Sequence, residues 1–240
     1  MGQAERMRLW LSLILTLAFA PAARSECRLA LVLALDVSAS VDASEYRLQM
    51  AGTAAALTSP RVRSALLGAG GVPVAISVFV WSGPGDQELV ADWVAVDSDA
   101  ALGQLAATVA GHPRRIVFDG RTAIGSALIY ARDLINRGPA CVRRVIDVAA
   151  DGETNSGPAP EEVPLPEITV NALAVTGSQL IDHGDSDRTE RPLAVYLRLR
   201  VIRGTDAFVE LAQDYRDFEA AMTRKLEREL DGQVFSEARP

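Results

Sequence analysis

Short blocks of apolar and polar residues alternate along this chain, and their spacing predicts strands and helices in turn. The aliphatic runs are too short for typical helices and predict strands, several of them buried on both faces. The expected strands are residues 28–35, 74–81, 88–96, 142–151, 167–176 and 207–212. Apolar residues at helical spacing predict helices at 41–59, 97–111, 121–136 and 215–230. This alternation is typical of an α/β fold with a mostly parallel sheet.

The connections between these elements differ in length and composition. The short glycine- and proline-containing link between 74–81 and 88–96 predicts an antiparallel hairpin. Residues 152–166 contain four prolines, which exclude more than about one turn of helix. Residues 177–192 are polar and irregular, as in an exposed loop. Residues 193–202 fit a strand or a helix by their pattern alone.

Residues 1–25 have the pattern of a secretory signal peptide, so the folded part is expected to be one domain at 26–240. The segment starts with positive charge, continues with an apolar run at 9–20 and ends in small residues. That run is too short for a bilayer-spanning helix, which needs about 20 residues. Because the segment carries three arginines and one glutamate, its removal changes the net charge from −7 to −9. The mature chain is expected in the periplasm or outside the cell, without a membrane span, and its acidity argues against nucleic-acid binding.

Two of the expected strands end in an acid. Asp36 follows 28–35, and Asp151 closes 142–151. Ligand sites in open α/β sheets lie beyond the carboxyl ends of the strands. If these two strands are neighbours, the carboxylates meet at one edge, where they repel each other and need neutralising. Ser38 and Ser40 add hydroxyls directly after Asp36, and a donor set made only of oxygens selects hard cations such as Mg²⁺.

The stretch DVSAS at 36–40 resembles the Asp-x-Ser-x-Ser signature of the von Willebrand factor type A (vWA) domain. That family uses the motif in a metal-ion-dependent adhesion site, with a threonine at the start of a later helix and an aspartate after the fourth strand. Thr122 in GRTAIGSAL and Asp151 in DVAADGETN match those positions. The resemblance therefore implies a site for Mg²⁺, or for Mn²⁺ or Ca²⁺, made of Asp36, Ser38, Ser40, Thr122 and Asp151.

The resemblance also implies the architecture of nearly the whole mature chain. It predicts a doubly wound, Rossmann-like sheet of six strands, with one antiparallel edge strand and helices on both faces. More narrowly, the chain is similar to a bacterial exported branch of vWA-like proteins of unknown function. In that branch the C-terminal part of the domain consists of a helix, a strand and a helix. The resemblance therefore predicts that residues 193–202 are helical.

The function implied by the resemblance is binding rather than catalysis. Two carboxylates only just neutralise a divalent cation and hydroxyls add no charge, so the metal stays electrophilic and accepts a carboxylate from a protein partner. Two alternatives remain: a structural scaffold with a vestigial metal site, and a phosphatase of the haloacid dehalogenase class. That class needs a second acid where this chain has Ser38. It also needs a lysine near the site, and the sole lysine, Lys225, lies in the expected terminal helix.

The two cysteines lie at matching places in the pattern. Cys27 is nine residues before Asp36, and Cys141 is ten before Asp151. If those acids end adjacent parallel strands, the cysteines lie side by side at the opposite end of the sheet, and an exported protein is expected to join them. Two unpaired thiols are the alternative.

Other polar residues near these motifs have simpler interpretations. Asp42 has the spacing of a helix cap and is expected to start a helix rather than bind metal. Glu153 and Asn155 are expected to be solvated loop residues. His112 and His183 lie in polar surroundings and are expected to be exposed to solvent.

Overall fold

A single sheet of six strands organises the part of the chain that the computed structural model describes, residues 27–68, 72–114, 120–176 and 192–231. The strands are β1 (Cys27–Asp36), β2 (Val74–Trp81), β3 (Gln87–Val96), β4 (Cys141–Ala150), β5 (Thr169–Val175) and β6 (Val209–Ala212). Their order is β3-β2-β1-β4-β5-β6, and only β3 runs antiparallel to its neighbour. The expected mostly parallel sheet with one antiparallel edge strand is confirmed.

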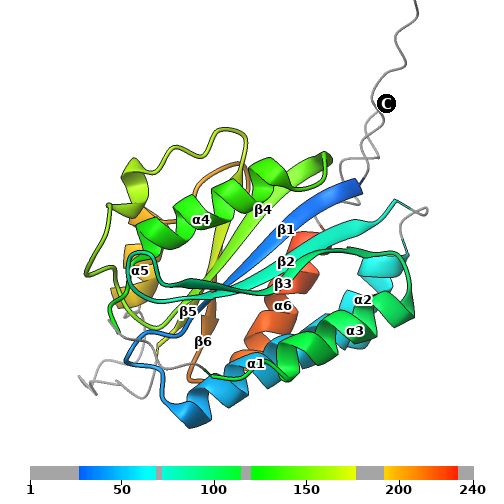
Figure 1. The fold of residues 1–240 in the computed structure, drawn as a ribbon, viewed down its shortest axis with the longest axis horizontal. Coiled ribbons are helices and arrows are strands. Elements are labelled where there is room, and N and C mark those ends of the chain that lie inside the picture. Colours follow the sequence, from blue (N-terminus) through cyan, green and yellow to red (C-terminus); the bar gives the residue numbers. More distant parts are fainter. Residues whose placement is uncertain (1–26, 69–71, 115–119, 177–191, 232–240) are drawn as a thin grey trace, which may run out of the picture.

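Helices cover both faces of this sheet (Figure 1). One face carries α1 (Ala43–Thr58), α2 (Pro60–Leu67), α3 (Asp99–Ala110) and α6 (Phe218–Asp231). The other face carries α4 (Ile124–Arg137), α5 (Pro192–Arg200) and the short 3₁₀ helix η1 (Pro160–Glu162). The connections that leave β1 and β4 therefore run to opposite faces. In open α/β sheets the ligand-binding crevice lies at such a point, outside the carboxyl ends of the two strands.

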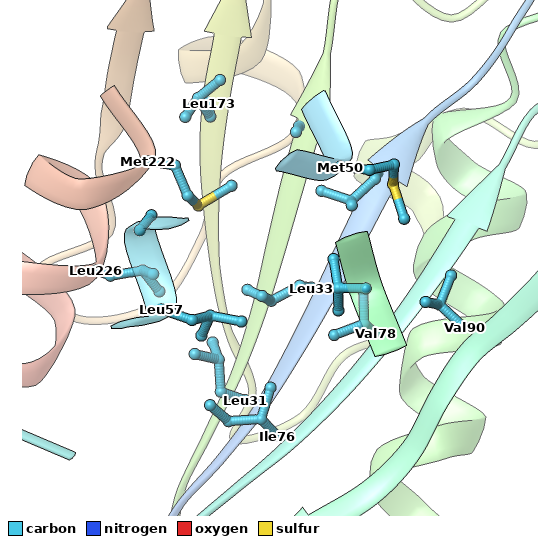
Figure 2. Close-up of a cluster of buried hydrophobic side chains, with 14 of the residues drawn as sticks. Leu31, Leu33, Met50, Leu57, Ile76, Val78, Val90, Leu173, Met222 and Leu226 are labelled. Carbon is cyan, nitrogen blue, oxygen red and sulfur yellow. The ribbon is translucent and has the colours of Figure 1, made fainter. Parts of the chain in front are cut away.

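The central strand β1 is buried on both faces, as its unbroken aliphatic sequence requires. Leu31 and Leu33 face the layer of α1 and α6, where they join the larger hydrophobic cluster (Figure 2). Val32 and Ala34 face the opposite way and belong to the cluster under α4 and α5. Because both faces are packed, the carboxyl end of β1 is a rigid support for the residues that follow it.

The expected helices are present, but their boundaries differ from the sequence prediction by up to three residues. Helix α1 ends at Thr58, but α2 follows at once from Pro60, because proline is well tolerated at the first position of a helix. The sequence analysis did not predict α2. The terminal helix α6 begins at Phe218 rather than 215, after a turn. The expected capping role of Asp42 is confirmed: its side chain accepts from the backbone N–H of Ser44 and Glu45.

The prolines of 152–166 leave room for η1 alone, and residues 193–202 are helical over most of their length in α5, as expected. The disulfide between Cys27 and Cys141 is also confirmed. These residues are direct partners in the register of β1 and β4, with Cα atoms 4.6 Å apart, at the end of the strands opposite Asp36.

The expected signal peptide at 1–25 and most of the expected loop at 177–192 lie outside the described residues. Among the helices that are described, none combines the length and the apolar character needed to cross a membrane.

Candidate metal centre

The five residues expected to form a metal site come together at the crevice between β1 and β4. Asp36 is the last residue of β1, and Ser38 and Ser40 follow in the loop before α1. Asp151 directly follows β4, and Thr122 lies two residues before α4. Three segments far apart in the sequence thus meet at one edge of the sheet, because β1 and β4 are parallel neighbours.

Hydrogen bonds link these side chains into a continuous chain. The hydroxyl oxygens of Ser38 and Ser40 are 3.2 Å apart, and the Thr122 hydroxyl donates to Ser38 Oγ at 3.3 Å. The Ser40 hydroxyl donates to Asp151 Oδ1 at 2.8 Å. The backbone N–H of Ser38 donates to Asp36 Oδ1 at 2.8 Å, which ties the first acid to the same group. The side chains of Ser38, Ser40, Thr122 and Asp151 are therefore linked through their oxygen atoms, and Asp36 is joined to them by the backbone N–H of Ser38.

The loop that carries Thr122 is held in place from both sides. Gly120 has φ +60° and accepts a backbone hydrogen bond from Ala39, between the two serines. A Cβ at Gly120 would lie 2.8 Å from the Cβ of Ala39, so the close approach of these loops requires glycine. On the other side, Asn155 Oδ1 accepts from the Thr122 N–H at 3.0 Å, and Thr154 Oγ1 donates to the Thr122 carbonyl at 3.2 Å.

The two acids of the site lie in a poorly solvated place. Asp36 is fully buried, and burial together with the nearby Asp151 carboxylate raises the pKa of Asp36 from 3.8 to about 7. Burial also raises the pKa of Asp151, by more than the hydrogen bond from Ser40 lowers it. Within the described residues, Asp36 Oδ2 has no hydrogen-bond partner. A buried carboxylate oxygen without a partner is costly unless a cation completes its surroundings.

The donor set fits a hard divalent cation better than a soft one. It consists of two carboxylates and three hydroxyls, and oxygen ligands are those that Mg²⁺, Mn²⁺ and Ca²⁺ prefer. Across residues 27–68, 72–114, 120–176 and 192–231, no group of three or more His, Cys, Asp or Glu is placed to hold a metal ion. The crevice site differs from such groups because most of its donors are neutral.

Asn155 and His112 do more than the sequence predicts. Asn155 is exposed, as expected, but its side chain also orders the Thr122 loop. His112 was expected to be exposed, but its side chain is only 11% exposed. Its ring lies between the hydroxyl of Tyr46, 2.7 Å from Nδ1, and Glu88, 3.3 Å from Nε2. The other histidine, His183, lies outside the described residues.

Sequence reasoning did not identify a fourth segment at this crevice, the connection between β6 and α6. Tyr215 from that connection is buried, and its interaction with Asp151 offsets a small part of the rise in the pKa of that acid. Glu45, in the first turn of α1, acts on Asp151 in the opposite sense. The only signal in the sequence is position: β6 is parallel to β5, so its carboxyl end lies at the same edge of the sheet as Asp36 and Asp151.

The comparisons with known proteins agree with this architecture. A family model described as "Protein of unknown function (DUF1194)" matches residues 26–234. The chain belongs to this family. A comparison with curated proteins finds no match. Similar solved structures are proteins with vWA domains, so this member of the family has a vWA fold.

Three of those structures show the range of the likeness. Proximal thread matrix protein 1 from the mussel byssus is 13% identical, with a TM-score of 0.59 over 86% of this chain and 49% of its own. The pilus adhesin SpaC from Lactobacillus rhamnosus GG is 15% identical, with a TM-score of 0.58 over 87% of this chain and 31% of its own. BatB from Bacteroides thetaiotaomicron is 17% identical, with a TM-score of 0.53 over 85% of this chain and 99% of its own.

The chain spans about half the length of the mussel protein and less than a third of the adhesin. At these identities the likeness establishes the fold alone.

Proposed function

We propose that this chain is an exported vWA-type binding module that uses a divalent cation, Mg²⁺ in the first place, to capture an acidic group of a protein partner. The cation would be held by Asp36, Ser38, Ser40, Thr122 and Asp151. The observation that carries the proposal is the convergence of these five oxygen donors from three segments, next to a buried carboxylate oxygen that lacks a partner among the described residues.

The charges of the site support a role in binding another molecule. Two carboxylates offset the charge of one divalent ion, and the hydroxyls of Ser38, Ser40 and Thr122 contribute none. Mg²⁺ takes six oxygen ligands, so a set in which acids act directly or through water leaves room for one more. A carboxylate from a partner is a hard oxygen donor that suits this position.

The solved relatives provide further support. One structure of the mussel protein has zinc in its metal-ion-dependent adhesion site (MIDAS) motif, and SpaC is a pilus adhesin. Export agrees with the disulfide between Cys27 and Cys141, because disulfides persist in oxidising compartments. The signal-peptide pattern at 1–25 points the same way.

The phosphatase alternative receives no support from the position of Lys225. The sole lysine of the chain lies on the buried side of α6 and is 1% exposed. It is paired with Glu229 of the same helix and with Asp147 of β4. A lysine held there is not available to a phosphate group bound beside Asp36.

The test is capture of partners by the immobilised chain from the cell-envelope fraction of the source organism, in Mg²⁺ or in EDTA. Retained proteins should elute with EDTA, and Thr122→Ala should retain less than a tenth of them. Thr108→Ala is the matched control, because Thr108 is an exposed threonine on α3 whose hydroxyl bonds its own helix. A soluble peptide with aspartate should compete, and the same peptide with asparagine should not. Equal capture in EDTA and by Thr122→Ala would show that the metal site is not used.

A further inference from the structure

Tyr215 occupies a rigid turn between β6 and α6. The turn is fixed by Asp214, whose Oδ1 accepts from the N–H of Arg216 and Asp217, and by Asp217, whose Oδ2 accepts from the N–H of Gln213. The Tyr215 ring is stacked on Phe218, with centroids 6.1 Å apart and an interplanar angle of 13°. Its side chain thus has little freedom to turn away from the crevice.

The hydroxyl of Tyr215 is the unusual part of this residue. Tyr215 is only 5% exposed, and its hydroxyl is buried without a hydrogen-bond partner among the described residues. Leaving a buried hydroxyl unpaired costs on the order of 1–3 kcal/mol. The groups that act on it most strongly are Asp151, then Asp36, then Glu45, so the hydroxyl faces the acids of the candidate metal centre.

We propose that Tyr215 is a positioning residue of the metal centre: its hydroxyl donates to the Asp151 carboxylate and holds that carboxylate in its metal-binding orientation. This inference rests on the proposed metal site. Metal-ligating carboxylates are themselves commonly hydrogen-bonded by such outer groups, and loss of one such bond typically weakens metal binding by about 10- to 100-fold.

A tyrosine suits this role better than a charged donor. An arginine or lysine beside Asp151 would supply a positive charge, which would compete with the cation for the two acids. The hydroxyl of Tyr215 orients the carboxylate and leaves its charge available. A tyrosine hydroxyl keeps its proton near neutral pH, because the ordinary pKa of tyrosine is about 10.

The test separates the hydroxyl from the ring. Tyr215→Phe removes the hydroxyl and keeps the stacking on Phe218, whereas Tyr215→Leu removes both. In calorimetric titrations of the full chain with Mg²⁺, both variants should bind about tenfold more weakly than the wild type. In EDTA, Tyr215→Phe should unfold at the wild-type urea concentration or above it, because the hydroxyl that it removes is buried and unpaired there. Tyr215→Leu should unfold earlier, because it also loses the stacking on Phe218. Tyr130→Phe is the matched control, since Tyr130 packs on Phe79 from α4 and should leave Mg²⁺ affinity unchanged.

A double-mutant cycle identifies the partner of the hydroxyl. In an Asp151→Asn background, Tyr215→Phe should weaken Mg²⁺ binding no further, because the carboxylate that the hydroxyl holds is already gone. If the wild type binds Mg²⁺ and Tyr215→Phe binds it equally well, the inference about Tyr215 is wrong and the proposed function stands. If the wild type does not bind Mg²⁺ or Mn²⁺ at all, the proposed function and the inference fail together.

Discussion

The part of the chain that the structure describes contains two pairs of acids along the same region of the sheet: an edge pair, buried Asp36 and half-buried Asp151, and a fully buried interior pair, Asp147 and Glu229. Asp36 and Asp151 lie at the carboxyl ends of β1 and β4. Asp147, four residues earlier on β4, lies beneath α6 beside Glu229. The second pair has a cation from the chain itself: Lys225 Nζ donates to Asp147 Oδ1 and, at 3.0 Å, to Glu229 Oε1.

The two acid pairs differ in where their neutralising positive charge comes from. In the interior pair, Asp147 and Glu229, Lys225 supplies the positive charge, and the amide of Asn171 donates a further hydrogen bond to Glu229 Oε1 at 2.6 Å. At the edge pair, the side-chain contacts between the described residues come from hydroxyl groups of serine and threonine and carry no charge. The interior pair is therefore a structural element of the core. The edge pair is suited to take its cation from solution.

The largest expected effect comes from removing the cation of the interior pair. Lys225→Met leaves Asp147 and Glu229 buried without a positive partner and should lower the free energy of unfolding by about 3–5 kcal/mol. Urea unfolding with and without Mg²⁺ measures this loss, which Mg²⁺ should not restore. Recovery of stability by millimolar Mg²⁺ would show that the two pairs are interchangeable and would remove the distinction.

The neighbouring Arg224 is the matched control. It is a half-exposed cation one residue away that pairs with Glu210 and Asp217. Exposed pairs of this kind contribute about 0–1 kcal/mol, so Arg224→Met should change the free energy of unfolding by less than about 1 kcal/mol. A loss equal to that of Lys225→Met would indicate a general effect of altering α6.

The second effect is a pH dependence that Mg²⁺ cancels. Because the pKa of Asp36 is raised from 3.8 to about 7, the folded metal-free chain binds one more proton than the unfolded chain between these values. Stability in EDTA should therefore be highest near pH 4 and fall as the pH rises to 7. Each pKa unit corresponds to about 1.4 kcal/mol, so the full effect is on the order of 4 kcal/mol.

The pKa of Asp147 is also raised, and it contributes in the same direction. The contribution of the edge pair to this pH dependence is measured by urea unfolding from pH 4 to 7. It is the difference between wild type and Asp36→Asn in the slope of the free energy of unfolding against pH. Saturating Mg²⁺ should abolish that difference in slope. A slope that is the same in both proteins in EDTA would contradict the account of Asp36.

The third effect is stabilisation by the metal itself. A ligand at 100 times its dissociation constant stabilises the folded state by about 2.7 kcal/mol. The wild type should gain this amount in Mg²⁺ at pH 7.5, measured by urea unfolding, and Asp36→Asn should gain nothing. An equal gain in both would place the stabilising ion elsewhere.

The smallest effect concerns the order of the Thr122 loop. Asn155→Ala removes the acceptor of the Thr122 N–H and should cost about 1 kcal/mol of stability in EDTA. Because Thr122 is then less well placed, Mg²⁺ affinity should fall several-fold in calorimetry. Thr154→Val tests a second side-chain bond to this loop, from Thr154 Oγ1 to the Thr122 carbonyl, and should have a similar effect. Unchanged affinity in both variants would mean that the loop is ordered by other contacts.

The sequence predicted the parts of the structure that depend on local pattern. Unbroken aliphatic runs identified β1 and β4, and an acid at each strand end placed Asp36 and Asp151 at one edge. The same register placed Cys27 opposite Cys141. Strand length can be predicted from a short stretch of sequence. The pairing of β1 with β4 was a condition of both predictions, and the structure shows that the condition holds.

The features that the sequence analysis did not predict depend on packing between distant segments. Tyr215 follows the last strand in a connection without a motif, and only the order of strands brings it to Asp151. Asn155 lies in a polar, proline-rich loop that resembles a solvated one. Asp147 gave a usable signal, because an acid in the middle of a buried strand must have a partner, but only the packing of α6 identifies it as Lys225.

The central claim is that a divalent cation binds at the edge pair and not at the interior pair. Diffraction from crystals grown with Mn²⁺, recorded where manganese scatters anomalously, locates the ion directly. The account predicts one strong peak per chain, within coordination distance of the hydroxyls of Ser38, Ser40 and Thr122 and beside Asp36 and Asp151. A peak beside Asp147 and Glu229 instead, or no peak at the crevice in the presence of saturating Mn²⁺, would contradict it.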